Sequence, residues 1–78
     1  EQKGNYQIKF ISVKPRKRLS LQYHFKRDEH WTIIKGTGTI QLNDKLIELG
    51  VNGTIFIPKE SKHRITNNTN EFVDFLEI

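Results

Sequence analysis

SLQYHFKRDEHWTIIKG, residues 20–36, predicts two strands joined by a short turn and a group of polar side chains at that turn. Gln22 and His24 are two residues apart, so in a strand they point to the same face. The turn at residues 26–28 reverses the chain and directs Glu29 back towards them. A second stretch, GTIFIPKESKHRITN at residues 53–67, supplies His63. One amide, one carboxylate and two imidazoles form a suitable ligand set for a metal ion.

Outward from this stretch, the rest of the chain carries strand signals, and no helical period is sustained over two turns. Short runs of aromatic and β-branched residues alternate with turns rich in Pro, Gly and Asn. The expected strands are residues 6–13, 18–25, 29–34, 39–42, 45–49, 54–57, 63–66 and 71–78. In the third strand, Trp31 shares the inward face with Glu29, as core or as a pocket wall, and His30 points away. The pattern predicts a single all-β domain over residues 1–78, a β-sandwich or barrel.

The size of the chain limits how stable such a domain can be. A domain of 78 residues buries only about 60% of the surface that its unfolded chain exposes. There is no cysteine, so neither a disulfide nor a thiolate metal site can support the fold. A bound metal or a homodimer interface is therefore the expected stabiliser. The first residue is Glu1 rather than methionine, which suggests a fragment or a trimmed chain.

The charge balance restricts the class of partner. A net charge of +4 favours an anionic partner. Nucleic acid is not expected, because the aromatic residues form no RNA-binding motif and there is no basic recognition helix. A phosphorylated small molecule fits the charge. No apolar run approaches the roughly 20 residues needed to cross a membrane, and there is no signal-peptide pattern, so a soluble, cytoplasmic protein is expected.

The two stretches also resemble a known family. Residues 22–36 resemble the first cupin motif, and residues 53–67 resemble the second, Pro-x-Gly-x-x-His-x-x-x-Asn. More narrowly, residues 13–36 look like the C-terminal cupin of type II phosphomannose isomerases. The residues that carry this likeness are Val13, Lys14, Pro15, Leu19, Ser20, Leu21, Gln22, His24, Arg27, Glu29, His30, Trp31 and Gly36, followed by Ile57, Pro58, His63, Arg64 and Asn67.

The resemblance implies a fold and an activity. The fold is a small cupin, a double-stranded β-helix or jelly-roll barrel, with one divalent metal ion (Zn, Co, Mn or Mg) in its mouth. The activity is the interconversion of mannose 6-phosphate and fructose 6-phosphate, which supports GDP-mannose synthesis for polysaccharides. Members of this family are commonly fused to a mannose-1-phosphate guanylyltransferase, a nucleotidyltransferase domain.

Carried over by position, the metal ligands are Gln22, His24, Glu29 and His63. Gln22 could instead hydrogen-bond a ligand without touching the metal. The chain departs from the family at Tyr23, where methionine is usual, and at Glu60, where the second motif has glycine. A residue with a side chain in that glycine position implies a changed or strained turn.

Three further residues are candidates for contact with the substrate. Arg27 and Arg64 closely follow proposed ligands and could hold a phosphate with two parallel hydrogen bonds. The alternative is that both are exposed arginines in loops. Lys26 is a candidate for the catalytic acid or base of the isomerisation, and a metal-bound water is the other candidate.

Two other classes of function remain open from the sequence. Two histidines and a carboxylate also describe the iron site of non-haem oxygenases, although a glutamine ligand would argue against that class. The third class is a non-catalytic cupin that binds a sugar or dimerises beside a nucleotidyltransferase domain. Normal folding and dimerisation without turnover in the presence of metal would favour this third class.

Overall fold

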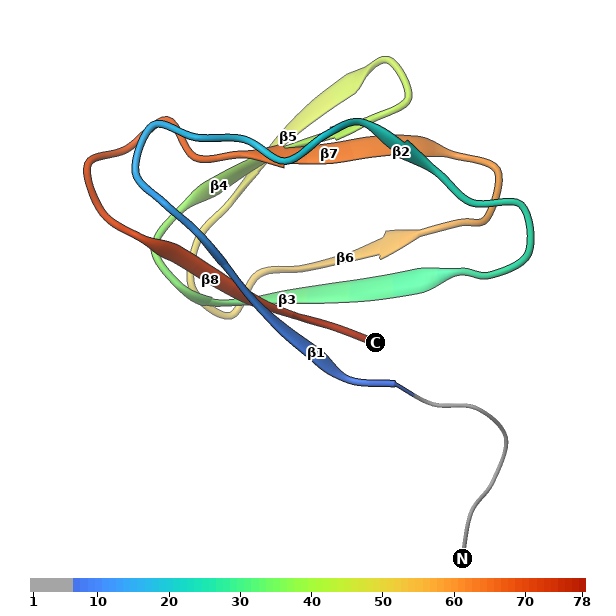
Figure 1. Cartoon of the computed structure of the whole chain (residues 1–78), viewed down its shortest axis with the longest axis horizontal. Coiled ribbons are helices and arrows are strands. Elements are labelled where there is room, and N and C mark those ends of the chain that lie inside the picture. Colours follow the sequence, from blue (N-terminus) through green and yellow to red (C-terminus); the bar gives the residue numbers. More distant parts are fainter. Residues whose placement is uncertain (1–6) are drawn as a thin grey trace, which may run out of the picture.

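Two four-stranded antiparallel sheets face each other in the computed structural model, which describes residues 7–78 (Figure 1). Their strands are β1 (Lys9–Val13), β2 (Gln22–Tyr23), β3 (Glu29–Lys35), β4 (Gly38–Leu42), β5 (Lys45–Leu49), β6 (Thr54–Ile57), β7 (Lys62–Thr66) and β8 (Val73–Glu77). One sheet has the order β1-β8-β3-β6, and the other has the order β2-β7-β4-β5. The predicted all-β fold is confirmed. Within residues 7–78 no helix is long and apolar enough to cross a membrane.

The predicted strands agree best with the structure where turn residues mark both of their ends. Strands β5 and β6 have the predicted bounds, and β3 extends the prediction by one residue. The first strand was predicted to begin at residue 6, which lies outside the described residues. The prediction of a continuous strand over residues 18–25 is wrong. Only Gln22–Tyr23 forms β2, and Arg18 makes an isolated bridge to Thr66. Because β2 is the edge strand beside β7, its ladder has a partner on one side alone.

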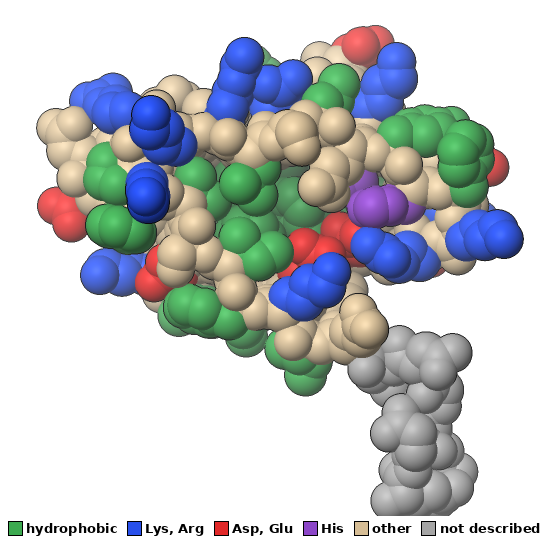
Figure 2. All heavy atoms as spheres, in the orientation of Figure 1, with side chains coloured by type: hydrophobic (Ala, Val, Ile, Leu, Met, Phe, Trp, Pro, Cys, Tyr) green, Lys and Arg blue, Asp and Glu red, His purple; other side chains and the backbone are tan. Residues whose placement is uncertain are grey.

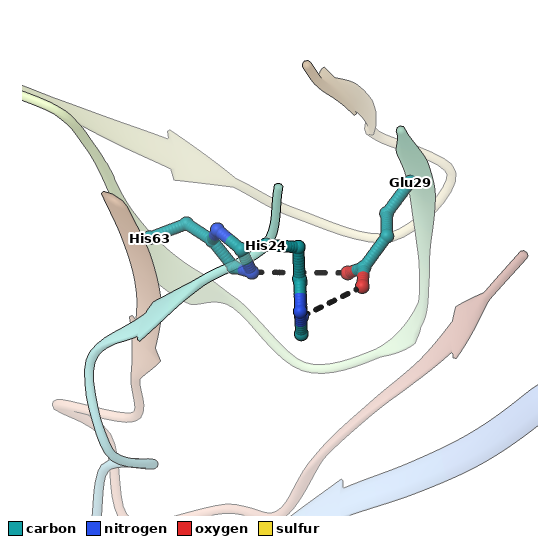
Figure 3. Close-up of side chains that lie close together, drawn as sticks. All are labelled: His24, Glu29 and His63. Atoms are coloured by element: carbon teal, nitrogen blue, oxygen red, sulfur yellow. Dashed lines mark ion pairs between the residues drawn. The ribbon is translucent and has the colours of Figure 1, made fainter. Parts of the chain in front are cut away.

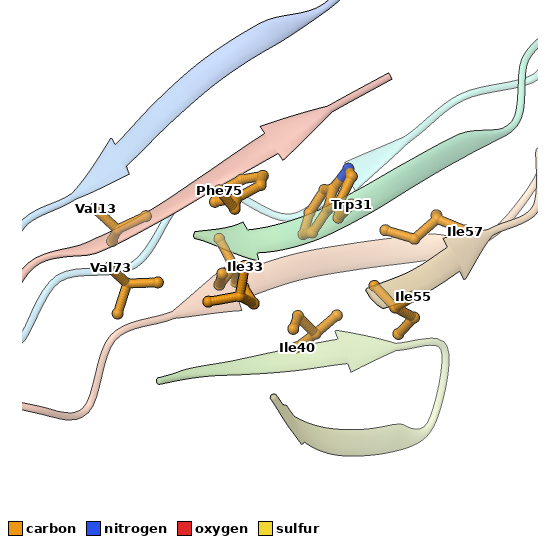
Figure 4. Packing of buried hydrophobic residues seen from close by; sticks show 9 residues of the cluster. Val13, Trp31, Ile33, Ile40, Ile55, Ile57, Val73 and Phe75 are labelled. Atoms are coloured by element: carbon orange, nitrogen blue, oxygen red, sulfur yellow. The ribbon is translucent and has the colours of Figure 1, made fainter. Parts of the chain in front are cut away.

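The apolar core lies between the sheets and receives side chains from both (Figure 4). Its buried members are Val13, Trp31, Ile33, Ile40, Ile55, Ile57, Ile65, Val73 and Phe75. The alternation in β3 explains its part in the core, since Trp31 and Ile33 point inward together with Glu29. The Trp31 ring lies 4.7 Å from the Phe75 ring and 5.6 Å from the ring of His63, measured between centroids. Trp31 therefore connects the core to the polar side chains.

A buried asparagine ties the end of β7 to two other segments. Asn67 is fully buried, and its Nδ2 donates hydrogen bonds to the carbonyl oxygens of Val13 (3.0 Å), Lys14 (3.1 Å) and Glu71 (2.7 Å). Its Oδ1 accepts hydrogen bonds from the backbone N–H of Thr69 (2.9 Å) and from the Thr69 hydroxyl (2.6 Å). One side chain thus joins the end of β1, the end of β7 and the turn before β8.

The turn between β6 and β7 contains the strain that the departure at Glu60 implies. Glu60 has a φ of 66°, in the left-handed region that favours glycine. Its backbone N–H donates a hydrogen bond to the carbonyl oxygen of His24, in the segment that follows β2. This contact brings the turn against the segment that carries one of the proposed metal ligands.

Replacing Glu60 with glycine is expected to raise the free energy of unfolding by about 1 kcal/mol, because glycine adopts a left-handed φ without steric cost. The measurement is chemical denaturation of both proteins. The matched control is Lys59→Gly in the same turn, where φ is not positive. That control should lower stability by about 0.5–1 kcal/mol through the greater entropy of the unfolded chain. A fall in stability for Glu60→Gly would show that its φ is not strained.

Candidate metal centre

Three of the four predicted ligands meet at one end of the core, although they come from different elements. His24 follows β2, Glu29 begins β3, and His63 lies in β7 (Figure 3). Their candidate ligand atoms all lie within 4.8 Å of one another. His24 Nε2 is 3.1 Å from Glu29 Oε2, and His63 Nε2 is 3.8 Å from Glu29 Oε1. The structure therefore brings together two imidazoles and a carboxylate at the spacing of a metal site.

Gln22, the fourth predicted ligand, is placed by strand register. It lies directly opposite His63 in the β2–β7 pair. Residues opposite each other in an antiparallel pair project from the same face. Both residues line a small pocket of about 50 Å³, together with Trp31. Gln22 thus faces the site, and its coordination of a metal stays a prediction.

One ring nitrogen of His63 is hydrogen-bonded to the backbone, and the other is free to bind a metal. The residue is 1% exposed, and its Nδ1 lies 3.0 Å from the carbonyl oxygen of Ser61. A carbonyl can only accept, so in the neutral ring Nδ1 carries the proton and Nε2 keeps its lone pair. Among residues 7–78 the buried Nε2 has no hydrogen-bond partner. Buried polar atoms are rarely left unpaired, and a lone pair directed at a carboxylate and a second imidazole fits a divalent ion.

Glu29 is a buried carboxylate whose two oxygens have different partners. The residue is 3% exposed, and Oε1 accepts a hydrogen bond of 3.0 Å from the indole Nε1 of Trp31. Oε2 accepts a hydrogen bond of 3.3 Å from Arg27 Nε, and Arg27 Nη2 lies 3.3 Å from the same oxygen. Trp31 therefore orients the carboxylate as well as filling the core. The sequence signal for this bond was the two-residue spacing of Glu29 and Trp31 within one strand.

The electrostatics of the site favour a neutral His24. Burial lowers the pKa of His24, Arg27 and His63 lower it further, and Glu29 opposes the shift. The neutral imidazole is the form that can donate a lone pair to a metal. A second carboxyl nearby behaves differently, because burial and the neighbouring Glu29 raise the pKa of Glu77. No motif in the sequence points to Glu77.

Glu29 of the cluster also lines a cleft of about 590 Å³. Its lining residues are Gln7, Lys9, Lys26, Arg27, Asp28, Glu29, Glu77 and Ile78. Figure 2 shows acidic and histidine side chains together in a hollow of the surface, with lysine and arginine side chains around it. A cleft with cations at its rim and a carboxylate-histidine cluster within reach suits a small anionic molecule.

The three candidate substrate contacts lie in different places. Lys26 is exposed and lines the cleft. Arg27 also lines the cleft, with its side chain 56% exposed and paired with Glu29. Arg64 borders the small pocket, but it is the neighbour of His63 in β7 and opposes Gln41 of β4. Adjacent strand residues project from opposite faces, so the Arg64 side chain is directed away from the metal cluster.

Comparison with known proteins agrees with this geometry. Residues 1–78 match the family model described as "Mannose-6-phosphate isomerase C-terminal". The chain is 40% identical over 75 residues to alginate biosynthesis protein AlgA of Pseudomonas aeruginosa, covering 96% of this chain and 16% of that protein. It is 38% identical over 73 residues to mannose-1-phosphate guanylyltransferase ManC of Salmonella typhimurium, covering 94% of this chain and 15% of that protein. The chain thus spans less than a fifth of the length of these relatives.

Solved structures show the same fold. The cupin domain of Schizosaccharomyces pombe Cnp3 superposes with a TM-score of 0.90 at 12% identity, covering 99% of this chain and 53% of that one. A cupin-2 domain-containing protein from Shewanella frigidimarina gives a TM-score of 0.82 at 23% identity, covering 99% of this chain and 72% of that one. At these identities the likeness establishes the fold alone, which is that of a cupin.

Proposed function

Because the chain belongs to the family of mannose-6-phosphate isomerase C-terminal domains, we propose that it interconverts mannose 6-phosphate and fructose 6-phosphate in a metal-dependent reaction. The observation that carries the proposal is the cluster of His24, Glu29 and His63, whose carboxylate also lines a cleft bordered by cations. An aldose–ketose isomerase for a sugar phosphate needs both the cluster and the cationic cleft. The cluster would bind the metal that polarises the sugar carbonyl, and the cleft would bind the phosphate.

His24, Glu29 and His63 would hold the metal, with Gln22 as a fourth ligand. A divalent ion held there would supply a Lewis acid for the carbonyl of the sugar. The Ser61 carbonyl and the Trp31 indole fix the orientation of two of these side chains, and such supporting hydrogen bonds typically govern metal affinity. Lys9, Lys26 and Arg27 line the cleft and would bind the phosphate.

The wider setting of the domain is also part of the proposal. The relatives named for alginate biosynthesis and for mannose-1-phosphate guanylyltransferase are far longer than the matched region. This supports a role in GDP-mannose synthesis in the cytoplasm, beside a fused guanylyltransferase domain. A homodimer is supported by exposed apolar side chains of the β1-β8-β3-β6 sheet, among them Phe10 and Phe56.

The direct test is a coupled assay from mannose 6-phosphate to fructose 6-phosphate. The protein is first treated with a chelator, and Zn²⁺, Co²⁺, Mn²⁺ or Mg²⁺ is then added separately. We expect no turnover in the chelated protein and its recovery with at least one of these ions. A protein that binds metal stoichiometrically but turns over no substrate would overturn the isomerase function and favour a non-catalytic sugar-binding cupin.

One observation favours a second candidate function. The three clustered residues, two histidines and one carboxylate, are the ligand set of non-haem iron oxygenases. Oxygen consumption by the Fe²⁺-loaded protein in the presence of a sugar phosphate would support this class. Coordination by Gln22 would argue against the oxygenase class, because a fourth protein ligand occupies a coordination position that oxygen or substrate needs.

A further inference from the structure

We propose that Glu77 is the catalytic acid–base residue that moves the proton between C1 and C2 of the sugar. The inference rests on the proposed isomerase function and deepens it. From the sequence, Lys26 and a metal-bound water are the candidates for this role. The position of Glu77 in the fold favours Glu77 over both of them.

Strand register directs Glu77 into the barrel. It lies opposite Trp31 in the β3–β8 pair and opposite Lys9 in the β1–β8 pair. Opposed residues share a face of the sheet, so Glu77 points to the same side as the buried Trp31. The Trp31 ring packs against His63 and donates to Glu29. Glu77 therefore projects towards the metal cluster from the neighbouring strand.

Glu77 lies where two spaces meet. It lines the small pocket that contains Gln22 and His63, and it also lines the larger cleft that contains Arg27 and Glu29. It is the one carboxylate among the residues that border both. A sugar phosphate with its phosphate in the cleft and its carbonyl end at the metal ligands would pass Glu77. An acid–base group must reach its proton from this kind of position.

The other carboxylates of the cleft have different contacts. Asp28 Oδ1 accepts a hydrogen bond of 2.7 Å from the backbone N–H of Lys59 and so closes the turn before β3. Glu29 is a member of the proposed ligand set and is bound by Trp31 and Arg27. Glu77 is left as the carboxylate that neither closes a turn nor belongs to the ligand cluster.

The lysines of the cleft suit the phosphate better than the proton transfer. Lys9 and Lys26 are both exposed at the cleft. A lysine ammonium group has three donors and no acceptor, which fits phosphate oxygens and does not fit a base. We therefore assign Lys26 to phosphate binding and Glu77 to proton transfer.

The proposed step is balanced within the substrate and one carboxylate. The Glu77 carboxylate removes the proton from C2 of the open-chain aldose, and the C2–H electron pair forms the C1–C2 double bond. The carbonyl π electrons move to O1. The proton on O2 then moves to O1, and the C2–O2 carbonyl forms as C1 takes the proton back from the Glu77 carboxylic acid. The product is the ketose, Glu77 returns to its carboxylate form, and no oxidant or reductant is needed.

The test is the variant Glu77→Gln, with Glu48→Gln as a matched control, because Glu48 is exposed on β5. Formation of fructose 6-phosphate from mannose 6-phosphate, and exchange of the C1 and C2 hydrogens with deuterium, are followed by NMR in D₂O with the metal-loaded 78-residue protein. We expect Glu77→Gln to slow both conversion and exchange by about 10²–10⁴-fold. Calorimetry with a non-reacting hexitol phosphate should show that this variant still binds the ligand, and Glu48→Gln should match the wild type.

The outcomes separate this inference from the proposed function. Exchange in the wild type that persists at full rate in Glu77→Gln overturns the role of Glu77 and leaves the isomerase function standing. Absence of fructose 6-phosphate formation in the metal-loaded wild type overturns the isomerase function, and the role of Glu77 with it. If Glu77→Gln does not fold, Glu77→Asp decides, because it keeps the charge and shortens the side chain. Unchanged exchange in Glu77→Asp overturns the role, and slowed exchange with retained hexitol phosphate binding supports it.

Discussion

Replacement of His63 with alanine is expected to abolish metal retention and isomerase activity together. His63 supplies a buried Nε2 lone pair that has no hydrogen-bond partner among residues 7–78, while its Nδ1 is held by the Ser61 carbonyl. Residues that only support a ligand typically change metal affinity by about 10–100-fold. Loss of a ligand itself should exceed that range. The measurement is metal content after dialysis, together with calorimetric titration of the ion.

The chain offers a matched control in His30. It lies on β3 beside Glu29, but it is exposed and projects from the opposite face. His30→Ala should therefore keep both metal and turnover. His63 also packs against Trp31, so His63→Gln is added to preserve most of the buried volume. Metal retained at wild-type affinity in folded His63→Ala and His63→Gln would contradict the ligand assignment.

Replacement of Asn67 with alanine is expected to lower the free energy of unfolding by about 3–5 kcal/mol. The physical reason is the number of hydrogen bonds lost at one fully buried side chain. The two N–H groups of Asn67 are shared among three carbonyl oxygens, and its Oδ1 accepts from two groups of Thr69. Each full hydrogen bond contributes on the order of 1 kcal/mol. The whole free energy of unfolding of a native protein is only about 5–15 kcal/mol. Urea denaturation followed by circular dichroism measures the loss.

Asn68 is the control for this change because it has the same side chain in the next position. It is exposed, and its Nδ2 donates one long hydrogen bond of 3.4 Å to the hydroxyl of Thr39. Asn68→Ala should change stability by no more than about 0.5 kcal/mol, as is usual for surface substitutions. Equal effects of the two substitutions would show that the buried hydrogen bonds of Asn67 are not what stabilises the end of β1.

Much of the fold could be predicted from local patterns, and the exceptions have physical causes. Strands with turn residues at both ends, such as β5 and β6, were predicted with their observed bounds. The predicted strands at residues 39–42 and 45–49 leave room for a two-residue turn alone, and Asn43 in that turn has a positive φ of 54°. The prediction of a strand over residues 18–25 failed because the local pattern shows only that a strand is favoured. Whether a strand forms also depends on a neighbouring strand with which it can pair. The single partner β7 pairs with two residues of β2.

The site could be predicted in part for a similar reason. His24, Glu29 and His63 were found by spacing and family resemblance, and the structure brings them together. Glu77 was missed because its place beside the cluster depends on the pairing of β8 with β3, which no local motif encodes. Arg64 was chosen for its nearness to His63 in sequence. In a strand that nearness places the two side chains on opposite faces.

The position of Trp31 gives the protein a built-in optical reporter. Trp31 is the only tryptophan in the chain, so all indole emission comes from one place. That indole donates to Glu29 and lies 5.6 Å from the ring of His63. A paramagnetic ion such as Co²⁺ held by these residues would quench the emission, whereas Zn²⁺ would shift it without quenching. Fluorescence titration with the two ions can therefore follow occupancy of the site in the unlabelled protein, independently of any sugar.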